Sequence, residues 1–356
     1  MLAIVCATKD RSEFVSRLLY YYAKVNCPYT IYLADSSEGE HLEEVLSVID
    51  KLNSQIKVVH RAYPGKSGPV AFKEMLGIVQ EKYATCLGDD DFLVPNSIEK
   101  CIAFLEDNQE YATAHGKAVL YTLDRVGAYG RIESFGGYNL GENEYKTPNQ
   151  RLVYFLSNYW VIGFSVHRTK EFNQAYEQCD VLQDDLFTEV LNGCISIIHG
   201  KSKLIDCLYL FRQVHNQRDK TRKSTLDWIT NRNWQPSFQI FHDRVVEALK
   251  QYEGITRETA SDIVKQAYWK CFAGGVCAEI QAQKVFRKGT IAFQSKVKRI
   301  PGLGYLYRNI KSRIPGPQNA FCLENMLKRS SSYHKDFMPV YNVITSSEVK
   351  ITSEIF

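Results

Sequence analysis

The chain has 356 residues, of which 45% are hydrophobic and 24% are charged. These values are ordinary for a globular protein and exclude extensive disorder, because the apolar content is sufficient for a packed core. The 44 basic and 40 acidic residues give a net charge of +4, which is too small for this length to indicate nucleic-acid binding. No apolar run approaches the ~18 residues that a membrane-spanning helix needs.

The N-terminal apolar run is short and ends at Lys9, and it lacks the basic start of a signal peptide. The ten cysteines include no Cys-x-x-Cys pair, so a zinc site has little support. We therefore expect buried free thiols in a reducing compartment and a cytoplasmic location.

Strand-like and helix-like segments alternate through the first hundred residues. The expected strands are 2–7, 30–34, 56–59 and 83–87, and the expected helices are 11–24, 40–53, 70–82 and one opened by Pro95. This alternation predicts an α/β fold with a mostly parallel sheet flanked by helices. Ligands of such sheets bind beyond the carboxyl ends of the strands.

The pattern changes after residue 110. We expect strands at 112–121, 159–167, 194–199 and 204–211, a helix at 184–191, a long loop at 125–150 and a helical region from 225 to 280. Three parts follow from this division. They are a catalytic domain at 1–215, a helical extension at 216–283 and a basic, aromatic tail at 284–356.

Three adjacent carboxylates, Asp89, Asp90 and Asp91, follow the fourth strand. They repel one another unless solvent or a cation compensates them, and hard divalent cations prefer carboxylate oxygens. An acidic turn stabilised by the dipole of the helix opened by Pro95 is the alternative interpretation. Polar residues at the ends of the first two strands, Asp35 among them, favour a metal site.

Two later features are ambiguous alone. Asp184 and Asp185 begin a predicted helix, where acidic residues are favourable without any function. His215 follows the last strand of the core, and a lone histidine is usually structural unless it has partners.

The order of these features resembles the GT-A glycosyltransferases, and the inverting family 2 enzymes in particular. The resemblance rests on residues 7–11 (Ala-Thr-Lys-Asp-Arg), 33–37 (Leu-Ala-Asp-Ser-Ser), 87–91 (Leu-Gly-Asp-Asp-Asp), 160–165, 184–185 and His215. It covers residues 2–215 and suggests a divergent bacterial subgroup of surface-polysaccharide pathways. Gly88 replaces the first acid of the family's usual motif, which leaves open whether Asp89 and Asp91 or Asp90 and Asp91 bind metal.

The resemblance implies a role for each motif. Thr8, Asp10, Arg11 and Asp35 would line the nucleoside pocket, Lys66 would meet the donor, and Gly163 would belong to an acceptor-side loop. Asp89, Asp90 and Asp91 would face the nucleotide sugar, and Asp89, Asp91 and His215 would hold Mn²⁺ or Mg²⁺. Asp185 would be the catalytic base with Asp184 as its substitute, because adjacent helical residues point about 100° apart.

The expected activity is thus metal-dependent, inverting transfer of a sugar from a nucleotide-sugar donor to a hydroxyl of a glycan or lipid-linked saccharide. A sugar nucleotidyltransferase is one alternative, although the glycine-rich phosphate loop of that class is missing after the first strand. A non-catalytic sugar- or membrane-binding protein with a relic site is the other. No recognition module for nucleic acid is evident.

The segment from Lys284 to Arg313 holds nine basic residues and no acidic one, with aromatic and aliphatic residues between them. This composition suits a peripheral contact with an anionic membrane surface, where each nearby cation contributes ~1 kcal/mol. A solvated helical face with lysine stems lying over the core is the alternative.

Overall fold

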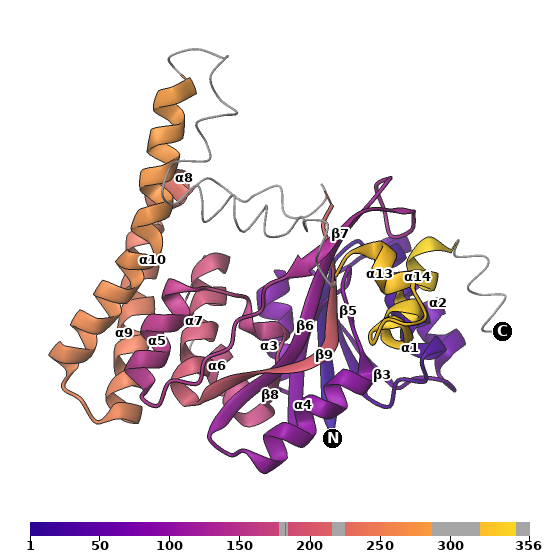
Figure 1. Cartoon of the computed structure of the whole chain (residues 1–356), viewed down its shortest axis with the longest axis horizontal. Coiled ribbons are helices and arrows are strands. Elements are labelled where there is room, and N and C mark those ends of the chain that lie inside the picture. The colour runs from indigo at the N-terminus through magenta and orange to yellow at the C-terminus, as the bar shows by residue number, and fades with distance from the viewer. Residues whose placement is uncertain (178–181, 183, 216–224, 287–320, 347–356) are drawn as a thin grey trace.

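A computed structural model describes residues 1–177, 182, 184–215, 225–286 and 321–346. Nine strands form one sheet in the order β3-β2-β1-β4-β8-β6-β9-β5, with β7 paired to β6 (Figure 1). The expected α/β architecture is confirmed, because β1 to β4 are parallel and helices cover them.

The first half of the sheet follows the predicted alternation. Its elements are β1 (Leu2–Thr8), α1 (Ser12–Lys24), β2 (Thr30–Asp35), α2 (Gly39–Leu52), β3 (Val58–Ala62), α3 (Gly68–Leu76), β4 (Tyr83–Gly88), β5 (Phe92–Leu93) and α4 (Pro95–Asp107). Alternate residues of β1 enter two separate hydrophobic cores. Ile4 faces the core that contains α1, α2 and α4, and Val5 faces the core that contains α3. Burial on both faces explains why this strand is a continuous apolar run.

The second half of the sheet is mixed. It consists of β6 (Tyr111–Leu123), β7 (Ile132–Tyr138), β8 (Val166–Arg168) and β9 (Lys201–Gln213), of which β6 and β9 pair in parallel over most of their length. The helices α5 (Pro148–Ser157), α6 (Thr169–Glu177) and α7 (Asp185–His199) lie between these strands in the chain.

Three predictions for this half were wrong. Residues 125–150 contain β7 and the start of α5 instead of a continuous loop. The strand expected at 159–167 is reduced to β8, because the amide of Ser165 bonds to the Ile162 carbonyl and closes the 3₁₀ turn η1 (Ile162–Phe164). The strand expected at 194–199 is the last part of α7.

The error at 194–199 has a clear cause. Its β-branched, apolar composition is typical of a buried strand, yet the segment continues a helix that begins nine residues earlier, at Asp185. The guanidinium of Arg151 donates to the carbonyls of Ile197 and Ile198 and so satisfies the end of that helix.

The helices that follow the sheet are α8 (Thr225–Ile229), α9 (Trp234–Glu253) and α10 (Arg257–Phe286), as the helical pattern predicted. They stack beside α5 and α7, and α10 extends beyond the body of the protein (Figure 1). Most of the basic segment Lys284–Arg313 lies outside the described residues, so its membrane contact stays a prediction. Within the described part of the chain, no helix is long and apolar enough to span a membrane.

The C-terminal residues 321–346 return to the sheet and to α1 instead of forming a tail. They fold into α13 (Leu323–Leu327) and α14 (His334–Thr345), and α14 packs against α1 (Figure 1). The ring of Phe337 lies 5.5 Å from that of Phe135 and 6.0 Å from that of Phe211. The amide of Gly130, in the loop between β6 and β7, donates to the carbonyl of Ile344. This helix is therefore part of the main core.

We predict that Phe337→Ala lowers the free energy of unfolding by about 3 kcal/mol, because it leaves a cavity among buried aromatic rings. Urea denaturation would measure the change. Val126→Ala, at a residue that is 62% exposed, is the control and should change stability by less than about 0.5 kcal/mol. Equal effects of the two substitutions would show that α14 does not contribute to the core.

Candidate functional site

Three strands bring polar residues to one edge of the sheet. Thr8 at the end of β1 is in register with Asp35 at the end of β2, and Ala7 is in register with Gly88 at the end of β4. The residues that follow these positions therefore lie close together. This is the edge at which the parallel arrangement predicts a ligand.

The ends of β1 and β2 are tied to each other. Asp10 adopts the left-handed region with φ of 52°, which short polar residues tolerate, and its amide donates to Ser37 Oγ at 2.7 Å. The carboxylate of Asp35 accepts from the Ser37 amide at 2.8 Å and contacts His60 Nε2 at 3.2 Å. Burial raises the pKa of Asp35, but these hydrogen bonds outweigh it and hold the pKa below its usual value.

The acid run, Asp89–Asp91, folds back over Gly88. The Asp91 amide donates to the Gly88 carbonyl at 3.1 Å, and a Cβ at position 88 would lie only 2.7 Å from Asp90 Oδ1. A side chain at position 88 would therefore require the Asp90 carboxylate to shift, which gives Gly88 a steric rationale.

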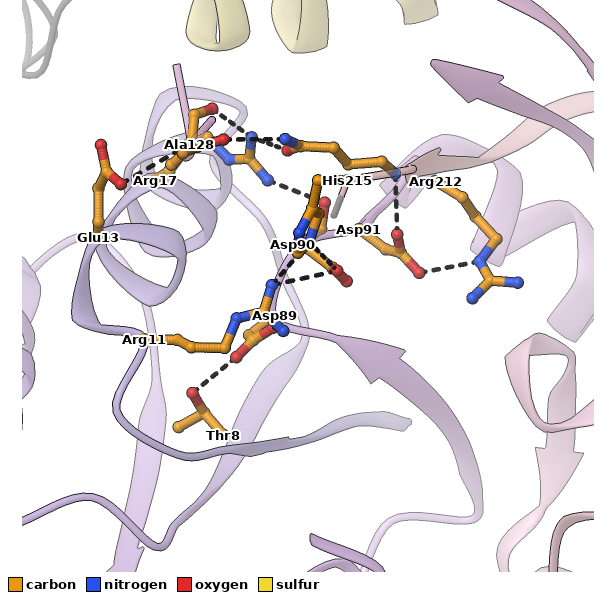
Figure 2. A network of polar contacts seen from close by, with 12 residues as sticks. Thr8, Arg11, Glu13, Arg17, Asp89, Asp90, Asp91, Ala128, Arg212 and His215 are labelled. Carbon is orange, nitrogen blue, oxygen red and sulfur yellow. Dashed lines mark hydrogen bonds and ion pairs between the residues drawn. The ribbon is translucent and has the colours of Figure 1, made fainter. Parts of the chain in front are cut away.

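The carboxylate of Asp89 is buried between β1 and Arg11. It accepts from Thr8 Oγ1 at 2.7 Å, and its other oxygen lies 2.7 Å from Arg11 Nη1 (Figure 2). Burial and the negative charge of Asp90 raise the pKa of Asp89 to about 7, despite the opposing effect of Arg11.

The carboxylate of Asp90 meets His215 and the second terminal nitrogen of Arg11. Arg11 Nη2 lies 3.2 Å from Asp90 Oδ2 and 3.0 Å from His215 Nε2, and these two atoms are 2.9 Å apart (Figure 2). A guanidinium only donates, so His215 Nε2 accepts from Arg11 when it carries no proton and donates to Asp90 Oδ2 when it carries one, but it cannot do both at once. The ring of His215 is held by stacking on Phe14 at 5.2 Å. Asp90 and His215 thus face one positively charged nitrogen, which belongs to Arg11.

Asp91 has a different environment from the one expected of a metal ligand. Its Oδ2 accepts from Arg212 Nε at 3.1 Å and its Oδ1 accepts from the Gln213 amide at 3.1 Å, and the side chain is fully buried (Figure 2). Both oxygens are thus held by the end of β9. In the described ranges, no group of three or more His, Cys, Asp or Glu side chains is arranged to hold a metal ion.

The expected set of Asp89, Asp91 and His215 therefore does not meet around one point in this structure. The donor set that fits a divalent cation best is Asp90 with His215, because both already face the nitrogen of Arg11. Carboxylate and imidazole are both ligands of Mn²⁺-type ions.

The backbone of the acid run is held by a buried arginine, Arg17 of α1. Arg17 donates to the carbonyl of Asp90 at 2.8 Å, to Gln213 Oε1 at 2.6 Å and to the carbonyl of Ala128 (Figure 2). The side chain is fully buried. It joins α1, the acid run, β9 and the loop between β6 and β7.

The two acids at the start of α7 differ in position. Asp184 is the N-cap residue, with Oδ1 accepting from the Phe187 amide at 3.0 Å and Oδ2 accepting from Trp228 Nε1 at 2.8 Å. Asp185 is the first residue of the helix. Asp184 therefore caps the start of α7, which is the structural role expected of an acid at this position.

The remaining predicted residues lie apart from the acid run. Lys66 pairs with Glu74 at an exposed position. Gly163 lies in η1, where a Cβ would be 3.8 Å from Cys86 Cβ at the end of β4. The turn of residues 162–165, which we call the η1 turn, is thus adjacent to the strand that leads into the acid run.

Arg17, Arg212 and Gln213 were not predicted from the sequence. The position of Arg17 among the apolar residues of the first helix could have indicated a buried, functionally important arginine. Arg212 and Gln213 lie at the end of β9, and their contacts with Asp91 depend on how the strands are arranged, which the sequence does not show.

The comparisons with known proteins bear on the first part of the chain. Residues 4–156 match the family model of glycosyl transferase family 2. The match covers less than half of the chain, confirms the resemblance drawn from the motifs of this segment and supports a glycosyltransferase. Enzymes of this family generally use a divalent metal ion.

Solved structures support the fold. The chain is similar to residues 1–349 of S. aureus TarS in complex with UDP-GlcNAc, with a TM-score of 0.52 and 12% identity, over 87% of this chain and 81% of that chain. Longer S. aureus TarS aligns with 96% of this chain and 54% of its own length, with 11% identity and a TM-score of 0.47. The first likeness confirms the GT-A fold. No curated protein sequence matches the chain.

Two buried histidines beside the η1 turn predict a pH dependence of stability. Burial lowers the pKa of His115 to about 4 and that of His167 to about 3. The unfolded chain takes up these protons below about pH 6.5 and the folded chain does not, so stability is full above pH 6.5 and is lost as the pH falls.

We expect His115→Asn to reduce the slope of unfolding free energy against pH, averaged between pH 6.5 and 5, by about 1 kcal/mol per pH unit. Urea titrations at several pH values would measure it. His41→Gln, at an exposed histidine, is the control. An unchanged slope in His115→Asn would contradict the neutral, buried state of His115.

Proposed function

We propose that the chain transfers a sugar from a nucleotide-sugar donor to a hydroxyl of a glycan or lipid-linked saccharide, with inversion at the anomeric carbon. The observation that carries this proposal is that Asp90 and His215 both contact one nitrogen of Arg11. This contact lies at the edge of the sheet where β1, β2 and β4 end. A cation held there would face the phosphates of a bound nucleotide.

Asp90 and His215 would hold a divalent ion, with Arg11 moving aside. Mn²⁺ or Mg²⁺ would supply a Lewis acid that neutralises charge on the departing nucleotide. Asp89 would remain beside Thr8, where it orients Arg11 toward the same phosphates. The register of Thr8 with Asp35 supports a nucleoside position along the ends of β1 and β2.

Asp185 would remove the proton of the acceptor hydroxyl, which then attacks the anomeric carbon from the face opposite the nucleotide. The contacts of Asp184 with the Phe187 amide and Trp228 favour Asp185 over its neighbour as the base. Trp228 belongs to α8, so the helices after the sheet support the start of α7. The η1 turn would border the acceptor.

The metal assignment can be tested by thermal shift. UDP-GlcNAc, the nucleotide sugar bound by the similar S. aureus protein, with Mn²⁺ is the first ligand to use. A ligand at about 100 times its dissociation constant stabilises a protein by about 2.7 kcal/mol. We expect Asp90→Asn to lose the Mn²⁺-dependent part of this shift, because the carboxylate that faces the cation becomes neutral.

Asp50→Asn, on the exposed surface of α2, is the matched control and should keep the whole shift. Other UDP-, GDP- and dTDP-sugars would follow in the same assay. A shift that is independent of Mn²⁺ in the wild-type protein would contradict a metal-dependent donor site.

The base assignment predicts different results for two adjacent acids. Asp185→Asn should reduce UDP release by at least about 100-fold with little change in donor binding, because a general base is lost. Asp184→Asn should retain far more activity than Asp185→Asn, because asparagine still caps the helix, although its amide group cannot accept from both Phe187 and Trp228 as the carboxylate does. The reverse result would make Asp184 the base.

A further inference from the structure

Arg212 connects the acid run with the η1 turn. Only 14% of its side chain is exposed, and its Nε lies 3.1 Å from Asp91 Oδ2. Its Nη1 donates to Tyr138 Oη at 3.0 Å, and its Cζ lies 4.3 Å from the centre of the Phe164 ring. One guanidinium thus contacts the acid run by its edge and the η1 turn by its face.

Helix α7 packs against the η1 turn, and the polar contacts of the turn come from the strands of the sheet. The Phe164 carbonyl accepts from Tyr209 Oη at 2.7 Å and from Thr85 Oγ1 at 3.1 Å. His167 Nε2 donates to the Ile162 carbonyl at 3.0 Å, and His115 contacts Ser165 Oγ at 3.1 Å. These contacts hold the backbone of the turn, and the guanidinium of Arg212 is the charged group that lies over the buried ring of Phe164.

We propose that Arg212 is a positioning residue that sets the η1 turn at a fixed distance and orientation from the acid run. This inference rests on the proposed function, in which the acid run faces the donor and the turn borders the acceptor. Asp91 then has a role of its own, which is to anchor Arg212 and not to bind metal. The bridge Asp91–Arg212–Phe164 aligns the acceptor with the anomeric carbon.

The chemistry of arginine suits this task and that of lysine does not. A planar guanidinium can bond to a carboxylate by its edge while its face lies over an aromatic ring. An ammonium would keep the charge beside Asp91 but lose the stacking on Phe164 and the bond to Tyr138. Burial opposes the charge, yet the carboxylate of Asp91 outweighs it and raises the pKa of Arg212, so the guanidinium stays charged.

The test compares donor binding with turnover in Arg212→Lys and Arg212→Met. UDP-GlcNAc with Mn²⁺ is the probe, or another nucleotide sugar if that binds better in the thermal-shift panel. Binding is measured by calorimetry and turnover by UDP release. Misplacement of reacting groups by about 1 Å can cost 100-fold in rate. We therefore expect kcat to fall by about 10- to 100-fold in both variants, with donor affinity changed by less than about threefold.

A double-mutant cycle separates positioning from a general loss of stability. Phe164→Leu should also lower kcat, and Arg212→Met combined with Phe164→Leu should be no slower than the worse single variant, because both changes break one bridge. Additive losses would mean that Arg212 does not act through Phe164. Stability is measured by urea in parallel, and all assays use conditions in which each variant is folded.

Arg168→Lys is the matched control. Arg168 of β8 also lies over an aromatic ring, Tyr83, and bonds to backbone carbonyls, but it contacts no residue of the acid run or the η1 turn. It should keep wild-type turnover. Full activity of Arg212→Lys, or equal losses of donor affinity and kcat, would overturn the positioning role. A wild-type protein that binds no nucleotide sugar would instead contradict the proposed function, and the bridge with it.

Discussion

The site depends on the compensation of three adjacent carboxylates in a nearly water-free turn. Burial of a charge is costly unless a partner and hydrogen bonds offset it. Here each acid has a partner. Arg11 pairs with both Asp89 and Asp90, His215 lies against Asp90, and Arg212 pairs with Asp91. Arg17 secures the backbone between them without pairing with a carboxylate. The turn therefore has a defined shape before any ligand arrives.

The two arginines that pair with the acid run differ in how easily another cation could replace them. The side chain of Arg11 is 28% exposed, whereas that of Arg212 is half as exposed, at 14%, and is clamped between rings. Under the proposed function, an incoming cation would take the place of the Arg11 guanidinium at Asp90 and His215. It would not easily displace that of Arg212. The three identical acids therefore have different roles under the proposed function: Asp90 exchanges its partner, Asp89 keeps Arg11 and Thr8, and Asp91 stays bound to Arg212.

The sequence was sufficient for the first half of the fold and for the edge at which the site lies. Apolar strands followed by Thr8, Asp35 and the acid run are local patterns, and parallel pairing brings their ends together. The roles within the acid run were not predictable, because they depend on Arg17 and Arg212, which lie far from it in the chain. The strand wrongly expected at 194–199 has the same origin, since Arg151 and the cap at Asp184 that define this helix are distant from the segment itself.

The long parallel pairing of β6 with β9 has a consequence for how the site is made. Residues 4–156 contain the whole acid run, but His215, Arg212 and Gln213 arrive only at the far end of β9. During synthesis, more than a hundred further residues must follow Asp90 and Asp91 before His215 and Arg212 leave the ribosome. Pairing across such a sequence separation is slow because loop closure must precede it. The first hundred residues thus supply the edge itself and Arg11, whereas the contacts of Asp90 with His215 and of Asp91 with Arg212 become available only once the chain through β9 has been made.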